Sequence, residues 1–167
     1  MKATYAHEFN CSAATFWERI FLSDEFNRAL YIDELKFPEY TVVESRDTGD
    51  TIIRKCRVTP KQDAPAAVQK LLGGKLQYVE EGVYDKAAGR YRFKVVTASM
   101  GDKVKTEGEF RVEPLGDKRI RRVVDMNIEV KIFGVGGMVE GFIGKSTQES
   151  YDAAAKFTNK WIAEKGL

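Results

Sequence analysis

The stretch Phe133-Gly-Val-Gly-Gly-Met-Val-Glu-Gly-Phe-Ile-Gly144 leads into the longest helical pattern of the chain. Glycines alternate in it with bulky apolar side chains, so the segment is both flexible and apolar. Two interpretations fit this combination. The segment is either a flexible gate over an apolar cavity or a tight turn that leads into a buried helix.

The residues after this stretch repeat with the period of an α-helix, to about Trp161. Small side chains occupy the middle of the apolar stripe and bulky ones its two ends, which predicts free space where the helix covers another surface. The stripe consists of Val139, Phe142, Ser146, Ser150, Ala153, Ala154, Phe157 and Trp161.

The chain before this helix alternates between apolar and polar residues in a way that is typical of β-strands. A first strand is predicted over residues 3–9, and Ser12 and Ser23 precede two short helical patterns. Turn sequences separate the later patterns, which predicts an antiparallel meander. The later strands are predicted over 36–45, 51–59, 75–84, 90–99, 104–114 and 119–132, with a helical insertion over 61–72.

A sheet with one apolar face needs a cover, and the C-terminal helix is the only long amphipathic element available. The predicted fold class is therefore α+β. A curved antiparallel sheet of about six to seven strands grips a long C-terminal α-helix, and two short helices follow the first strand.

Composition narrows the class of protein. The 167 residues fit a single domain over 1–167, and the net charge of +2 comes from interspersed acids and bases, which argues against a nucleic-acid partner. The basic run from Lys118 to Arg122 is interpreted as a solvated strand edge, with contact to anionic lipid headgroups as the alternative.

No cofactor or targeting signal is predicted. Cys11, Cys56 and the single His7 lack metal-ligand spacing, so neither a metal nor an organic cofactor is implied. The N-terminal residues have no apolar core, and no apolar run approaches about 18 residues. We therefore expect a cytoplasmic protein. The sequence also lacks the nucleophile-elbow, P-loop and zinc-protease motifs.

The order of elements and the segment from Val130 to Glu140 resemble the START-like (SRPBCC, Bet v 1-like) helix-grip superfamily, and more narrowly a little-characterised bacterial branch of it. The resemblance covers essentially the whole chain. It implies a hydrophobic tunnel between the sheet and the C-terminal helix. Members bind lipids, sterols, polyketides or plant hormones, and some cyclise or hydrolyse their ligand.

The predicted ligand-binding residues come from three sources: the strands, the glycine-rich segment and the helix that follows it. Aromatic side chains of the strands would line the tunnel, although a filled core is the competing interpretation. Arg54 alternates with Ile52 and Cys56, and either face of this strand could be the inner one. The full set is Arg54, Tyr78, Tyr91, Phe93, Phe110, Phe133, Val135, Met138, Phe142, Ser146, Ser150 and Ala154.

Three functional hypotheses follow. The first is a non-enzymatic protein that binds, and transports or sequesters, a lipid or another hydrophobic small molecule, with transient membrane contact through the glycine-rich segment. The second is an enzyme similar to the polyketide cyclases and aromatases or to the hydrolases, which requires an acid with a perturbed pKa in the cavity. The third is a protein-interaction module with a broad exposed apolar patch.

Overall fold

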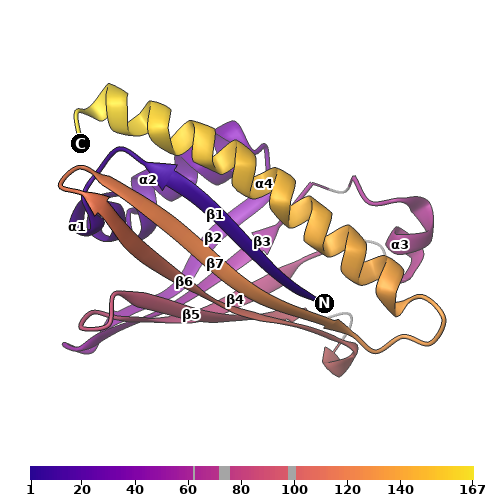
Figure 1. Cartoon of the computed structure of the whole chain (residues 1–167). Coiled ribbons are helices and arrows are strands. Elements are labelled where there is room, and N and C mark those ends of the chain that lie inside the picture. The colour runs from indigo at the N-terminus through magenta and orange to yellow at the C-terminus, as the bar shows by residue number, and fades with distance from the viewer. Residues whose placement is uncertain (62, 72–75, 98–100) are drawn as a thin grey trace.

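The computed structural model describes residues 1–61, 63–71, 76–97 and 101–167. Seven antiparallel strands form one sheet in the order β1-β7-β6-β5-β4-β3-β2 (Figure 1). Strands β2 to β7 form an antiparallel meander, in which neighbours in sequence are neighbours in the sheet. Strand β1 lies at the edge and pairs with β7. The strands are β1 (Lys2–Phe9), β2 (Glu39–Asp47), β3 (Thr51–Thr59), β4 (Tyr78–Asp85), β5 (Arg90–Thr97), β6 (Val104–Gly116) and β7 (Arg119–Val130).

Two short helical segments connect β1 to β2. Helix α1 (Ala13–Thr15) continues as a π-helical turn over Phe16–Phe21, and α2 (Asp24–Arg28) continues as a second one over Ala29–Glu34. Ser12 and Ser23 cap the two helices, because their side chains accept hydrogen bonds from the Thr15 and Phe26 backbone N–H groups. Both serines lie where the sequence predicts the helix starts.

Helix α4 (Gly136–Lys165) lies across the sheet and packs against β1, β7 and the Ala29–Glu34 segment (Figure 1). The fold class predicted from the sequence, a curved antiparallel sheet that grips a long C-terminal helix, is thereby confirmed. Helix α3 (Ala66–Leu71) lies in the predicted insertion.

The glycine-rich stretch is mostly helix rather than loop. Gly134 turns the chain with a φ of 80°, and from Gly136 onward the residues belong to α4. Position 136 requires glycine, because a Cβ built there would stand 2.5 Å from the Val130 carbonyl oxygen. Both interpretations of the stretch are therefore modified: the turn spans only about the first three residues, and the helix includes the rest.

Several strand ends differ from the predicted ones. Lys36 has a φ of 56°, in the left-handed region, so it ends the preceding helical segment and β2 begins only at Glu39. The predicted strand start at residue 75 and strand end at residue 99 lie outside the described residues.

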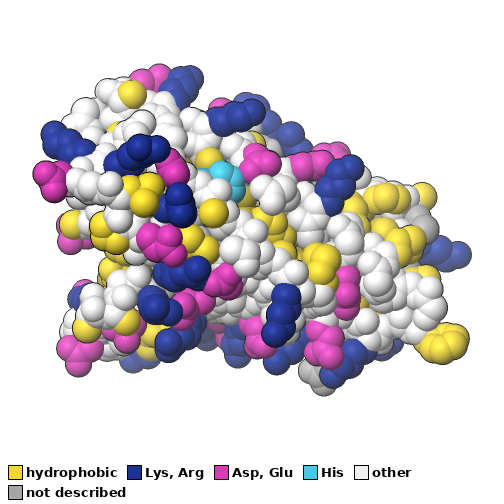
Figure 2. All heavy atoms as spheres, in the orientation of Figure 1, with side chains coloured by type: hydrophobic (Ala, Val, Ile, Leu, Met, Phe, Trp, Pro, Cys, Tyr) yellow, Lys and Arg dark blue, Asp and Glu magenta, His cyan; other side chains and the backbone are white. Residues whose placement is uncertain are grey.

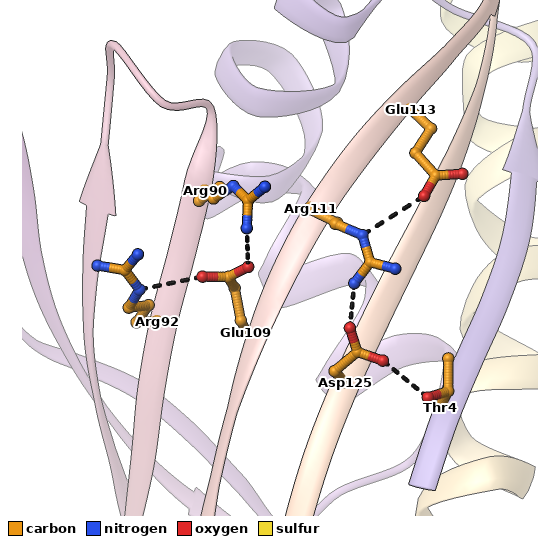
Figure 3. Close-up of polar contacts among 7 residues, drawn as sticks. All are labelled: Thr4, Arg90, Arg92, Glu109, Arg111, Glu113 and Asp125. Atoms are coloured by element: carbon orange, nitrogen blue, oxygen red, sulfur yellow. Dashed lines mark hydrogen bonds and ion pairs between the residues drawn. The ribbon is translucent and has the colours of Figure 1, made fainter.

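The outer face of the sheet carries paired charges. Glu109 accepts hydrogen bonds from Arg90 at 2.6 Å and from Arg92 at 3.0 Å, while Asp125 pairs with Arg111 and accepts a hydrogen bond from Thr4 (Figure 3). Acidic and basic side chains also intermingle over the face in Figure 2. This face is solvated, so the inner face beneath α4 must hold the core.

Candidate ligand-binding site

A cavity of about 230 Å³ lies between the inner face of the sheet, the short helical segments and α4. Its lining is mainly apolar and aromatic, with a few charged and hydroxyl groups. This composition is typical of sites for small organic molecules, although such sites usually measure about 300–1,000 Å³.

Nine of the twelve predicted site residues line this cavity, and three do not. Phe133 projects fully into solvent, Met138 is half exposed and Val135 caps the start of α4. Contact of this tip with a membrane stays a prediction. The nine that line the cavity are Arg54, Tyr78, Tyr91, Phe93, Phe110, Phe142, Ser146, Ser150 and Ala154.

Strand alternation turns Arg54 inward, where only 3% of the residue is exposed. Its guanidinium donates hydrogen bonds to the Phe21 carbonyl oxygen at 3.2 Å, the Asp24 carboxylate at 3.0 Å and the Tyr40 hydroxyl at 3.3 Å. Three oxygen partners, one of them charged, therefore compensate the burial of this cation. The open question of which face of β3 is the inner one is answered by this position.

Glu80 is a partly buried acid that lines the cavity. It lies on the inner face of β4 opposite Cys56 of β3, and it accepts a hydrogen bond of 3.0 Å from the Tyr91 hydroxyl. Burial raises the pKa of the Glu80 carboxyl, against the opposing effects of the Tyr91 hydrogen bond and the Arg54 charge. The carboxyl therefore keeps its proton to a higher pH than an exposed glutamate.

Gly82 makes the contact between Tyr91 and Glu80 possible. A Cβ at this position would stand 2.0 Å from the Tyr91 hydroxyl, so the ring can cross β4 only over a glycine. Gly108 of β6 has the equivalent role for Phe93, since a Cβ there would stand 2.8 Å from the Phe93 ring.

Phenol groups gather in the same space. Tyr31 stacks on Tyr40 with ring centroids 4.2 Å apart, and Tyr78 and Tyr151 also line the cavity. Within the described ranges, the hydroxyls of Tyr31, Tyr78 and Tyr151 form no hydrogen bond with the protein. Burial raises the pKa of all three phenols, so they stay protonated and can donate hydrogen bonds to a ligand.

A second buried arginine comes from β7. Arg122 is 6% exposed and lines the cavity, and it donates a hydrogen bond of 2.8 Å to Nδ1 of His7, whose Nε2 lies 2.7 Å from Asp152. The interpretation of the basic run as a solvated edge holds for Arg119 and Arg121 but is wrong for Arg122. Arg122 shares the inward side of β7 with Ile120 and Val124.

The predicted set omits many of the residues that line the cavity, and four of them bring polar groups that matter for binding: Tyr31, Tyr40, Arg122 and Tyr151. Alternation with the buried apolar residues of β7 is a signal that could have found Arg122. Tyr151 follows Ser150 on α4 and lines the cavity beside it, because residues on the flanks of an apolar helical stripe also face the covered surface. The middle of the stripe is therefore not uniformly small.

Neither a metal site nor a membrane-spanning helix is found. No group of three or more His, Cys, Asp or Glu side chains in the described ranges could hold a metal ion. No helix among the same residues is long and apolar enough to cross a membrane.

The comparisons with solved structures define the class of protein, which is the START-like, Bet v 1-like helix-grip fold. A START superfamily protein from Mycobacterium smegmatis matches with a TM-score of 0.61 and 20% identity over 96% of this chain and 98% of that one. Norcoclaurine synthase from Thalictrum flavum, in complex with dopamine and hydroxybenzaldehyde, matches with a TM-score of 0.66 and 16% identity over 96% and 87%. The Zhui aromatase/cyclase from Streptomyces sp. R1128 matches with a TM-score of 0.56 and 16% identity over 95% and 86%.

Within this fold, the chain belongs to the family described as "Protein of unknown function (DUF2505)", whose model matches residues 4–162. Comparison with curated proteins gives no significant match. At these identities the solved structures show the fold, and fold alone does not give activity.

Proposed function

We propose that this protein binds a small hydrophobic molecule between the sheet and α4, and transports or sequesters it. The observation that carries the proposal is the cavity of about 230 Å³ whose apolar walls surround three phenol hydroxyls without partners among the described residues. Removal of apolar surface from water, at about 25 cal/mol per Å², would drive binding, and the hydroxyls would orient the ligand.

The size of the cavity favours a compact ligand. A long-chain lipid would require α4 or the short helical segments to move away from the sheet. A ligand with one or two rings is accommodated with less movement, and the aromatic side chains of the walls can stack against it. The proposed ligand is therefore a small, ring-containing molecule with at least one hydrogen-bond acceptor.

A titration with matched variants tests this function. Ser150 lines the cavity from α4, so phenylalanine at this position would occupy ligand space, whereas the neighbouring Glu149 is exposed. Ser150→Phe should weaken the binding of a naphthalene probe by about tenfold or more, which corresponds to about 1.4 kcal/mol, and Glu149→Phe should leave it unchanged. Equal binding to both folded variants, or no binding to the wild type, contradicts the proposal.

Glu80 supports a second candidate function, an enzyme that moves protons on a bound carbonyl compound. A carboxyl with a raised pKa inside an apolar cavity is a common feature of general acid catalysis. Similar structures include the two enzymes named above. In this reaction the Glu80 proton would pass to the carbonyl oxygen, the α-carbon would lose a proton to water, and the reverse step would return a proton from solvent.

Deuterium exchange provides the test of the enzymatic candidate. In heavy water, the wild type should introduce deuterium at the α-carbon of an aryl methyl ketone faster than buffer alone, and Glu80→Gln should lower that rate by about 100-fold. The exchange is followed by proton NMR. An exchange rate equal to that of buffer, or one unchanged in Glu80→Gln, excludes Glu80 as an acid for this reaction.

A further inference from the structure

The two buried arginines of the cavity differ in how their charge is compensated. Arg54 has three oxygen partners, including the Asp24 carboxylate. Arg122 has one hydrogen bond, to a histidine nitrogen, and no carboxylate of the described residues lies within ion-pair distance of it. Arg122 is therefore the less compensated of the two cations.

Two aromatic rings provide part of the stabilisation that Arg122 lacks from charged partners. The Arg122 guanidinium carbon lies 5.3 Å from the centre of the Phe9 ring and 5.0 Å from that of Tyr151. Such contacts favour a cation in a desolvated site, but they do not replace the charge of a carboxylate partner. The rings thus hold the guanidinium in place without cancelling its charge.

The remaining donors near Arg122 are unused. Its Nε, like that of Arg54, is buried and has no hydrogen-bond partner, and the hydroxyl of Tyr151, whose ring lies against the guanidinium, has none among the described residues. His7 accepts a hydrogen bond from Arg122 and lies beside Asp152, so this carboxylate is one residue removed from the cation. Burial lowers the pKa of Arg122, because the interior of the protein solvates the charged guanidinium less well than water does.

Glu80, the one acid among the described residues that line the cavity, forms no ion pair with Arg122. Glu80 bonds to Tyr91, and burial keeps its carboxyl protonated to a higher pH than usual. The cavity therefore combines an under-compensated cation with several hydrogen-bond donors. A ligand that brings its own negative charge fits this arrangement better than a neutral one.

We propose that Arg122, together with the Tyr151 hydroxyl, binds the carboxylate of a small apolar carboxylic acid. This inference rests on the proposed ligand-binding function and names the class of ligand. The ring or chain of the acid would occupy the apolar space, and its carboxylate would be directed toward β7 and the middle of α4.

Matched probes of equal shape test the inference. A naphthalene carboxylate, ionised at pH 7, is titrated beside the neutral naphthalene carboxamide, and decanoate beside decanol, with calorimetry or probe fluorescence as the readout. The wild type should prefer the charged member of a pair by about 10- to 100-fold. Arg122→Met should bring the ratio of the two affinities to about one while binding of the neutral member persists.

Arg121→Met is the matched control, since Arg121 is the neighbouring cation on the outer face and pairs with Glu8. It should leave the preference unchanged. Arg122→Lys keeps the charge and should retain some of the preference, so it supplies the readout if Arg122→Met does not fold.

The outcomes separate the two proposals. Equal binding of charged and neutral probes by the wild type, or a preference that survives in folded Arg122→Met, overturns the inference and leaves the binding function intact. Failure of all four probes to bind contradicts the binding function itself.

Discussion

Glu80 and Glu81 are adjacent in β4 but experience opposite environments. Glu80 points into the cavity, and burial raises the pKa of its carboxyl above the usual 4.5. Glu81 points outward, where a hydrogen bond from Lys94 lowers the pKa of its carboxyl. Strand alternation alone produces this difference, so substitutions of the two residues can be compared directly.

The pair predicts opposite effects of pH on stability. The folded state holds the Glu80 proton more tightly than the unfolded chain does, so this residue lowers the free energy of unfolding as pH rises from about 4.5 through the folded pKa. Glu80→Gln keeps an acceptor for Tyr91 and removes this loss. The melting temperature of the variant should exceed that of the wild type at pH 8, and the difference should shrink toward pH 4.

Glu81→Gln should behave in the opposite way. Its depressed pKa contributes stability above the unfolded value, and this stability disappears as pH falls. The variant should therefore melt below the wild type at pH 8 and match it in acid. Parallel pH profiles for the two variants would contradict the assignment of inward and outward faces.

At the residue scale, the sequence predicts which side chains face the cavity better than it predicts their hydrogen-bond partners. Nine of the twelve predicted residues line the cavity, because strand and helix periods assign them to the apolar faces. Two of the three partners of Arg54, Phe21 and Asp24, lie in the helical segments after β1, far away in sequence, and only the folded chain shows them. The basic neighbours of Arg122 indicate a surface position, although alternation along β7 places it inside.

At the scale of elements, the start of α4 contains glycines in two different environments. Gly136 lies too close to the Val130 carbonyl oxygen to accept a Cβ, while nothing lies within 4 Å of a Cβ built on Gly141. The junction is fixed further by the Glu140 carboxylate, which accepts a hydrogen bond of 2.9 Å from the Val130 N–H. Gly136 therefore allows close packing of α4 against the end of β7, whereas Gly141 only lowers the stability of the helix.

Alanine substitutions should separate the two roles. Gly141→Ala should raise the free energy of unfolding by about 1 kcal/mol, the usual gain in an exposed helix. Gly136→Ala should lower it by about 1–3 kcal/mol, because the backbone must shift to remove the overlap. Urea denaturation measures both, and stabilisation by Gly136→Ala would show that α4 does not contact the end of β7 as described.

Elements are predictable where periodicity is strong and less so at their ends. The strand over Thr51–Thr59 has the predicted bounds, because turn residues stand on both sides of it. Glycine disfavours helices, so the sequence predicts a flexible segment at the glycine-rich stretch. Its continuity with the long α4 and its contacts with β7 override that preference.

At the scale of the whole molecule, a long helix crosses a seven-stranded sheet and the two surfaces do not fill the space between them. The order of elements predicts this arrangement, since only one long helix can cover the apolar face. The volume of the cavity and its charge could not be predicted. They depend on the packing of the Tyr91 ring over Gly82 and on which arginine pairs with a carboxylate, and tertiary contacts determine both.

The central claim is that the space beneath α4 receives an apolar ligand. Calorimetric titration of a naphthalene probe at several temperatures tests it most directly, because burial of apolar surface gives a negative heat-capacity change on binding. We expect saturable binding with a negative heat-capacity change in the wild type and in Glu149→Phe, and a strong reduction of binding in Ser150→Phe. The same binding in all three proteins would contradict it.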